Sequence, residues 1–193
     1  MKRVLFLVSY RGSGSDTLFK ILTANPRIQM VQTHTTYRSP AEAIQLASSP
    51  HKLNTTAAIY GDHLLFNHTF CCSQLYKHCK FIYVIRPARD TLNKLVSTGD
   101  YTPDSAFRYY TFRLCRMLEM AAQTPGAVLL AHDEIQTGLG VIDKYLNLKT
   151  PLVATPANED IEDVVDDGVV EKAQDIYEQY FYRFGKLQLE TNA

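Results

Sequence analysis

The chain has 193 residues, of which 46% are hydrophobic, and its 20 Lys and Arg residues balance 20 Asp and Glu residues. This length suffices for one well-buried domain and is short for two, so we predict a single domain over residues 1–193. The zero net charge argues against a general nucleic-acid or membrane-surface binder, and any anion site must therefore be local.

Short β-rich apolar runs alternate with longer helical patterns along the chain, as in α/β proteins. The apolar runs are nearly continuous, which is typical of parallel strands that are covered on both faces. The predicted strands are 3–9, 28–32, 57–61, 81–86 and 127–132, and the predicted helices are 15–24, 40–47, 64–78, 89–97, 105–123, 136–146 and 169–184. We therefore predict a three-layer α/β/α fold around a central, mainly parallel sheet.

The first strand runs into a glycine-serine turn and then a helix, in the segment VLFLVSYRGSGSDTLFKIL from Val4 to Leu22. A helix start of this kind binds anions, because its first N–H groups are unpaired and the helix dipole is positive there. The loop lacks the Gly-Lys-Ser/Thr ending of a nucleoside-triphosphatase P-loop. The sequence therefore predicts a phosphate-binding loop of another kind.

Ligands of open parallel sheets bind at the carboxyl ends of the strands, so the residues that follow each predicted strand are candidates. These residues are 10–17, 33–38, 62–63 and 86–90. At the last junction Arg86 ends the strand, Pro87 begins a helix and Lys94 follows two turns later. Such a pair of cations can hold a second phosphate. The alternative is that Arg86 pairs with a buried acid and Lys94 is an ordinary surface residue.

Four segments stand in an order typical of one enzyme family: YRGSGSDTLFKILTANPRI, AAIYGDHLLF, KFIYVIRPARDTLNKLVS and AVLLAHDEIQTGLGVIDKYLNL. They resemble, in turn, the 5′-phosphosulfate loop, the Gly-Asp-Lys segment, the 3′-phosphate motif and the strand with a Tyr-Glu-Asp-Leu helix of sulfotransferases that use 3′-phosphoadenosine-5′-phosphosulfate (PAPS). The resemblance spans about residues 4–148. It implies a P-loop nucleoside-triphosphatase-like fold and transfer of a sulfuryl group from PAPS to a hydroxyl or amine, leaving adenosine 3′,5′-bisphosphate.

The resemblance also implies which residues contact the donor. Arg11 takes the place of the loop cation if the loop carries one extra residue; a gapless match puts Gly12 there and Asp16 where the family has a hydroxyl. We prefer the first alignment, with Asp16 capping or flanking the helix start. At the second motif the proline is shifted by one, and Lys94 stands where the family has a serine, for which Ser97 is the fallback. The implied donor-binding residues are Arg11, Gly12, Ser13, Gly14, Ser15, Asp16, Thr17, Arg86, Lys94 and Ser97.

Sulfuryl transfer needs a base for the acceptor's proton, and histidine suits this role because its usual pKa is about 6.5. Near the predicted rim the candidates are His34, which we favour, and His63, which replaces the family's Gly-Asp-Lys lysine. Arg11 is expected to assist the donor side. The other histidines, His132 among them, are placed away from the rim, and either candidate can instead be an ordinary polar residue.

Three weaker signals complete the expectations. The acidic segment from Glu159 to Asp167 is typical of a solvated loop or helix start, and Arg108 and Arg113 are expected to meet an acidic acceptor or water. The four cysteines have neither metal-ligand nor disulfide-scaffold spacing, so we expect reduced thiols and no metal site. Without a signal peptide or membrane span the protein is expected to be cytoplasmic, with a small-molecule or glycan acceptor and no nucleic-acid or membrane partner.

Two other functions remain open. A P-loop nucleotide or small-molecule kinase would use Asp62 to hold magnesium, but the missing Lys-Ser/Thr removes the phosphate cation and the magnesium hydroxyl. A non-catalytic nucleotide-binding relative would keep the fold without the chemistry.

Overall fold

The structure is a computed structural model that describes residues 3–31, 39, 41–42, 45, 57–65, 79–124, 126–155 and 161–191, with the backbone alone for residues 3 and 184–191. Strands and helices alternate through most of the chain, as predicted. In order they are β1 (Arg3–Val8), α1 (Ser15–Ala24), β2 (Ile28–Val31), β3 (Ile59–Leu64), β4 (Cys79–Ile85), α3 (Ala88–Ser97), α4 (Pro103–Ala122), β5 (Val128–Ala131), the 3₁₀ turn η3 (His132–Glu134), α5 (Leu139–Leu146) and α6 (Asp167–Thr191).

The five strands form one sheet in the order β2-β3-β1-β4-β5, and every pair of neighbours is parallel. The predicted parallel sheet is therefore confirmed. The chain leaves the central strand β1 toward β2 on one side of the sheet and later reaches β4 on the other side. The strand order thus reverses at β1, and a ligand crevice is expected at the carboxyl end of this strand.

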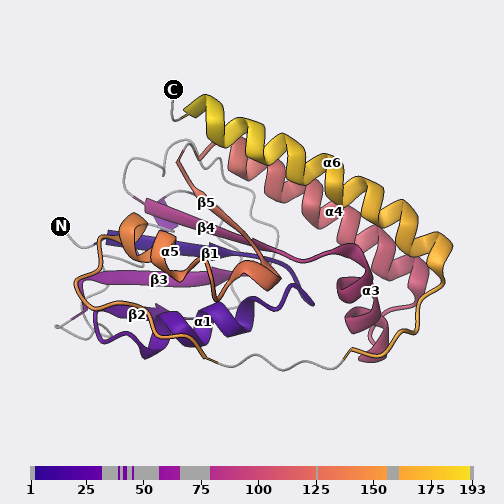
Figure 1. Cartoon of the computed structure of the whole chain (residues 1–193), viewed down its shortest axis with the longest axis horizontal. Helices are drawn as coiled ribbons and strands as arrows, with labels where there is room; N and C mark the ends of the chain where they lie inside the picture. Colours follow the sequence, from indigo (N-terminus) through magenta and orange to yellow (C-terminus); the bar gives the residue numbers. More distant parts are fainter. Residues whose placement is uncertain are drawn as a thin grey trace.

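Helices cover both faces of the sheet, which explains the continuous apolar pattern of the strands. Along β1, Val4, Phe6 and Val8 pack on the side of α3, α4 and α6, whereas Leu5 and Leu7 pack toward α1 and α5. Each such buried side chain contributes roughly 1.5–3 kcal/mol relative to exposure. Figure 1 shows α4 and α6 running side by side, with α3 next to one end of this pair. The fold is the predicted three-layer α/β/α arrangement.

Strand β3 is longer than predicted, and this changes the place of two candidate residues. It pairs with β1 as far as Leu64, with Asp62 opposite Phe6 and His63 opposite Leu7. The prediction that Asp62 and His63 follow the strand, and that a helix starts at Leu64, is therefore wrong. In the sequence, the change from apolar to polar residues at Asp62 is typical of the end of a strand. In the structure, the hydrogen-bond ladder with β1 continues through these residues.

Other parts of the predicted helices lie beyond what the structure describes. Residues 66–78 of the predicted helix 64–78 lie outside the described residues. Within the predicted helix 40–47, Ala41, Glu42 and Gln45 are helical and the remaining positions also lie outside.

The acidic segment was predicted to be a solvated loop or helix start, and α6 does start at its last residue, Asp167. Its described part also contacts the rest of the protein. Residues 161–167, here called the acidic strap, are fastened to α3. The buried Asn93 accepts hydrogen bonds through Oδ1 from the N–H groups of Val164 and Val165, each at 2.9 Å. Arg89 reaches Asp167 at 2.7 Å and Asp163 at 3.3 Å. The strap thereby ties α3 to the start of α6.

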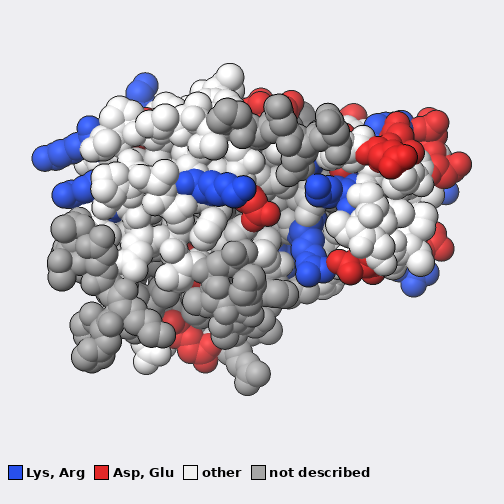
Figure 2. All heavy atoms as spheres, turned by 90° about the horizontal axis from the view of Figure 1, so that it is seen from below, with Lys and Arg blue, Asp and Glu red and all other residues white. Residues whose placement is uncertain are grey.

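On the face drawn in Figure 2, basic and acidic side chains are interspersed among the described residues. Within the described ranges, no helix has the length and apolar character needed to cross a membrane.

Candidate functional site

The loop between β1 and α1 begins the candidate site. Gly12 and Gly14 have positive φ values of 83° and 71°, a backbone region that side chains other than glycine rarely adopt. Gly14 is the N-cap of α1 and offers no side chain as a cap, and the Ser13 hydroxyl accepts the Ser15 N–H at 3.4 Å. The amide end of α1 therefore opens at the centre of the sheet's carboxyl edge, where the helix dipole favours an anion.

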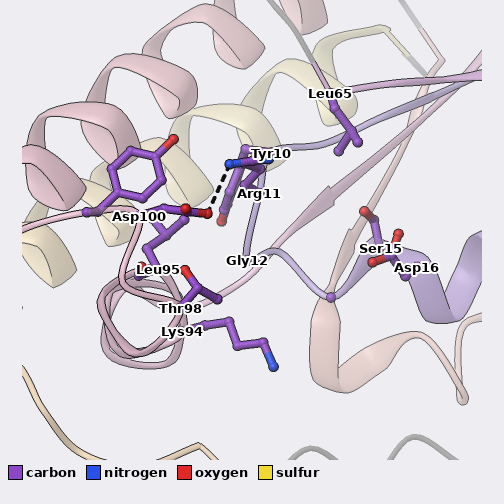
Figure 3. A pocket seen from close by; sticks show the side chains of 12 residues that line it. Tyr10, Arg11, Gly12, Ser15, Asp16, Leu65, Lys94, Leu95, Thr98 and Asp100 are labelled. Carbon is purple, nitrogen blue, oxygen red and sulfur yellow. Dashed lines mark hydrogen bonds and ion pairs between the residues drawn. The ribbon is translucent and has the colours of Figure 1, made fainter. Parts of the chain in front are cut away.

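A pocket of about 330 Å³ lies beside this loop (Figure 3). Its wall combines the loop and the start of α1 with α3 and the turn that follows α3. The lining residues are Tyr10, Arg11, Gly12, Gly14, Ser15, Asp16, Leu65, Lys94, Leu95, Thr98, Asp100 and Tyr101. The two predicted phosphate-binding segments, far apart in the sequence, thus meet in one pocket through the loop and Lys94.

Arg11 lies in the pocket wall, but its guanidinium is engaged with a carboxylate. Its Nη1 is 3.4 Å from Asp100 Oδ2, and its backbone N–H donates to the Tyr109 hydroxyl at 3.0 Å. In Figure 3, Arg11 and Asp100 face one another on one side of the pocket, and Ser15 and Asp16 lie on the other. That Arg11 is the phosphate cation remains a prediction, which requires the guanidinium to leave Asp100.

Asp16 flanks the helix start, as the preferred alignment expects. It is the acidic residue of the first turn of α1, its side chain is exposed, and it lines the pocket without capping the helix. A carboxylate at this end of a helix is stabilised by the dipole.

Lys94 and Ser97, the two candidates from α3, are separated by the structure. Lys94 is half-buried and lines the pocket. Ser97 is exposed, does not line the pocket and donates its hydroxyl proton to the carbonyl oxygen of Lys94 at 3.0 Å. Ser13 and Thr17 likewise lie outside the pocket wall, and Ser13 is buried.

Arg86 supports the loop from behind. It is buried, its Nη1 donates to the carbonyl oxygen of Gly12 at 3.4 Å, and its Nε lies 3.5 Å from Asp90 Oδ2. The end of β4 is also tied to the loop by Tyr10, whose hydroxyl donates to the Arg86 carbonyl and accepts from the Arg86 N–H. Arg86 therefore lies outside the pocket wall and places its positive charge behind the glycine loop.

A second buried guanidinium comes from α4. The expectation that Arg113 meets an acceptor or water is wrong: it is buried and its Nη2 donates to the carbonyl oxygen of Ser9 at 2.8 Å. Burial lowers the pKa of Arg113 from its usual value. Together with Arg86 it adds positive potential beneath the loop, which favours an anion in front of it.

His63 lies beneath the loop and helix start. Its Nε2 is 2.7 Å from Ser9 Oγ and 2.9 Å from Ser15 Oγ, and these two hydroxyls are 2.8 Å apart. The Phe19 ring stacks on the imidazole at 5.5 Å between ring centres. His63 is therefore buried behind Ser15. The other predicted base, His34, lies outside the described residues.

His132 touches the loop, although the sequence prediction placed it away from the rim. It directly follows β5, and a Cβ added at Gly14 would overlap its imidazole at Cδ2 and Nε2. The signal was available, because the fifth predicted strand, 127–132, ends at His132, in a sheet whose strand ends form one rim.

Asp62 does not have the position that the kinase alternative requires. It is buried within β3, and its Oδ1 accepts the backbone N–H of His63 at 2.8 Å. In the part of the chain that the structure describes, there is no group of three or more His, Cys, Asp or Glu side chains that could hold a metal ion.

The comparisons with known proteins rest on structure. No protein-family model matches the sequence, and no curated protein matches it. The fold is similar to that of mouse sulfotransferase SULT7A1, solved in complex with PAP, with a TM-score of 0.53 and 16% sequence identity. The match covers 96% of this chain and 66% of that chain, so this chain spans about two thirds of the length of SULT7A1. The chain therefore has a sulfotransferase-like, P-loop-like α/β fold.

Proposed function

We propose that the protein binds PAPS and transfers its sulfuryl group to a hydroxyl or amine of a small-molecule acceptor. One observation carries the proposal: the glycine loop at the start of α1 and Lys94 of α3 line the same pocket. These are the two places to which the sequence resemblance assigns the two phosphate groups of the donor. The fold supports it, because the similar mouse sulfotransferase was solved with PAP, which we take as adenosine 3′,5′-bisphosphate.

The residues in and behind the pocket wall fit a nucleotide that carries two separate anionic groups. Its volume of about 330 Å³ falls within the range of roughly 300–1,000 Å³ that is usual for ligand sites. The uncapped start of α1 offers N–H groups, Lys94 offers an ammonium, and Arg86 and Arg113 lie buried behind the loop. Of the two acids in the wall, Asp100 is already paired with Arg11.

When bound, PAPS supplies an activated sulfuryl group, which passes from its bridging phosphate oxygen to the acceptor's oxygen or nitrogen. The chain's own residues hold and orient the donor. The loop and Lys94 fix its anionic ends, and this fixed geometry favours an in-line approach of the acceptor. Arg11, once released from Asp100, neutralises charge on the departing phosphate. His34 remains our predicted base for the acceptor's proton, and His63, behind Ser15, acts on the loop instead.

Titration calorimetry with adenosine 3′,5′-bisphosphate, PAPS and ATP, with and without magnesium, tests the proposal. We expect magnesium-independent binding of the bisphosphate and PAPS, with ATP much weaker. Tight binding of ATP only with magnesium would favour a kinase, and absence of any nucleotide binding would favour a fold without the chemistry. A sulfation screen over sugars, phenols, steroids and peptides then identifies the acceptor.

A further inference from the structure

Three polar side chains from three elements meet beneath the loop. Ser9 follows β1, Ser15 begins α1 and His63 belongs to β3, and their Oγ and Nε2 atoms form a triangle with sides of 2.7, 2.8 and 2.9 Å. All three residues are at most 3% exposed. Ser15 alone of the three also lines the pocket. A ligand that binds in the pocket beside Ser15 can therefore affect His63 through the Ser15 hydroxyl.

The number of protons in this triangle is limited. Each hydroxyl has one proton to donate, and Nε2 offers either one proton or one lone pair. An anion beside Ser15 accepts the proton of its hydroxyl, and that proton is then lost to the triangle. If Nε2 has no proton, only the Ser9 proton remains for three short contacts. Two of them then bring lone pairs together, which is unfavourable in a buried site.

A proton on Nε2 removes this conflict. His63 Nε2–H then donates to Ser9, Ser9 donates to Ser15, and Ser15 donates to the anion. Each donor has an acceptor, and the hydroxyl of Ser15 has a fixed direction. We propose that His63 is a positioning residue of the anion loop, and that an anion bound at Ser15 causes its Nε2 to take up a proton from the solvent. The identity of the anion rests on the proposed function, whereas the proton count does not.

The charged groups around His63 come from several elements. Asp62 of β3 accepts the backbone N–H of His63 through Oδ1, and Asp16 of α1 follows Ser15 directly. On the other side, Arg113 of α4 donates to the Ser9 carbonyl, and Arg86, which directly follows β4, donates to the Gly12 carbonyl. The acids favour a protonated ring and the guanidiniums oppose it, so an added anion in the pocket shifts the balance toward protonation.

Nitrogen NMR of the histidine rings tests the proposal directly, because it reads which ring nitrogen carries a proton. The full chain is labelled with ¹⁵N-histidine, its six histidines are recorded at fixed pH, and His63 is assigned with the H63Q variant. The probes are adenosine 3′,5′-bisphosphate and inorganic sulfate, which stays fully ionised near neutral pH. We expect Nε2 of His63 to gain proton occupancy as either anion saturates the site. Unchanged protonation in a saturated complex overturns the proposal.

Variants separate positioning from a structural role. The H63Q variant keeps an N–H donor at this position, so its anion affinity should stay within about threefold of the original and should no longer depend on pH. The H63L variant has no such donor, and its anion affinity should fall about tenfold. If H63L does not fold, S15A provides the test: it leaves His63 in place, and the ring should no longer respond to the anion. A ring that still responds in S15A contradicts the relay.

The outcomes also separate this inference from the proposed function. If sulfate binds and shifts His63 but the bisphosphate does not bind, the positioning role stands and the sulfotransferase proposal fails. If the bisphosphate binds and His63 does not respond, the sulfotransferase proposal stands and the positioning role fails. If neither anion binds, both are overturned.

Discussion

Arg11 and Asp100 form an ion pair in the wall of the pocket, with 3.4 Å between Nη1 and Oδ2 and with both side chains 59% exposed. A pair this exposed is worth little, about 0–1 kcal/mol, because water and salt screen it. A phosphate group in the pocket can therefore compete with Asp100 for the guanidinium. The ion pair holds the guanidinium of Arg11, the predicted cation of the loop, at one side of the pocket.

Asn in place of Asp100 should strengthen the binding of adenosine 3′,5′-bisphosphate by about two- to fivefold, because Arg11 no longer has to leave a carboxylate. Calorimetry at low and high salt measures this, and the gain should shrink as salt screens the charges. D104N, an exposed acid at the start of α4, makes the same charge change outside the pocket and serves as control. An equal gain in both variants would mean that only net charge matters.

Gly14 is the loop position that should tolerate a side chain least. Its φ is +71°, and a Cβ there would overlap the His132 imidazole. G14A should therefore destabilise the fold by at least about 1 kcal/mol more than G99A, where φ is also positive, at +77°, but the space is open. Urea unfolding measures the difference. Removing the ring in the double variant G14A/H132A should recover part of the loss; no recovery would show that backbone strain alone is responsible.

The fold was largely predictable because strand and helix patterns are local. The apolar run from Val4 to Val8 predicts a strand. The turn with Gly12 and Gly14 that follows it predicts a loop and the start of a helix. The parallel sheet followed from runs that are apolar on both faces.

The rule that ligands bind after strand ends placed the glycine loop at the pocket, but it misplaced His63, which lies within β3. The structure brings Lys94 into the pocket wall, whereas it buries His63 and Arg113 outside this wall. In the sequence, the polar side chain of His63 is typical of a residue that follows a strand, and that of Arg113 is typical of an exposed helix face. They are buried because Ser9 and Ser15 satisfy His63, and because the Ser9 carbonyl satisfies Arg113. Such long-range hydrogen bonds leave no local pattern in a sequence.

Lys94 should contribute mainly to the 3′-phosphate. We expect K94A to weaken adenosine 3′,5′-bisphosphate by about tenfold and adenosine 5′-phosphosulfate, which lacks that phosphate, by less than about threefold. Calorimetry with both ligands gives the two ratios. K144A removes the same charge from the exposed face of α5 and should change neither affinity appreciably. Equal losses for the two ligands in K94A would contradict a 3′-phosphate role.

The acidic strap should depend on one buried amide more than on its ion pairs. Asn93 is 2% exposed and accepts two backbone N–H groups, so N93A leaves the buried Val165 N–H and the part-buried Val164 N–H unpaired and should destabilise the protein by about 2–3 kcal/mol. Arg89 is exposed, and R89A should have a smaller effect that disappears at high salt. Urea unfolding of both variants at two salt concentrations separates the two contributions. Because Asn93 precedes Lys94 on α3, N93A should also weaken the bisphosphate, whereas R89A should not. A larger, salt-sensitive loss in R89A would mean that the ion pairs hold the strap.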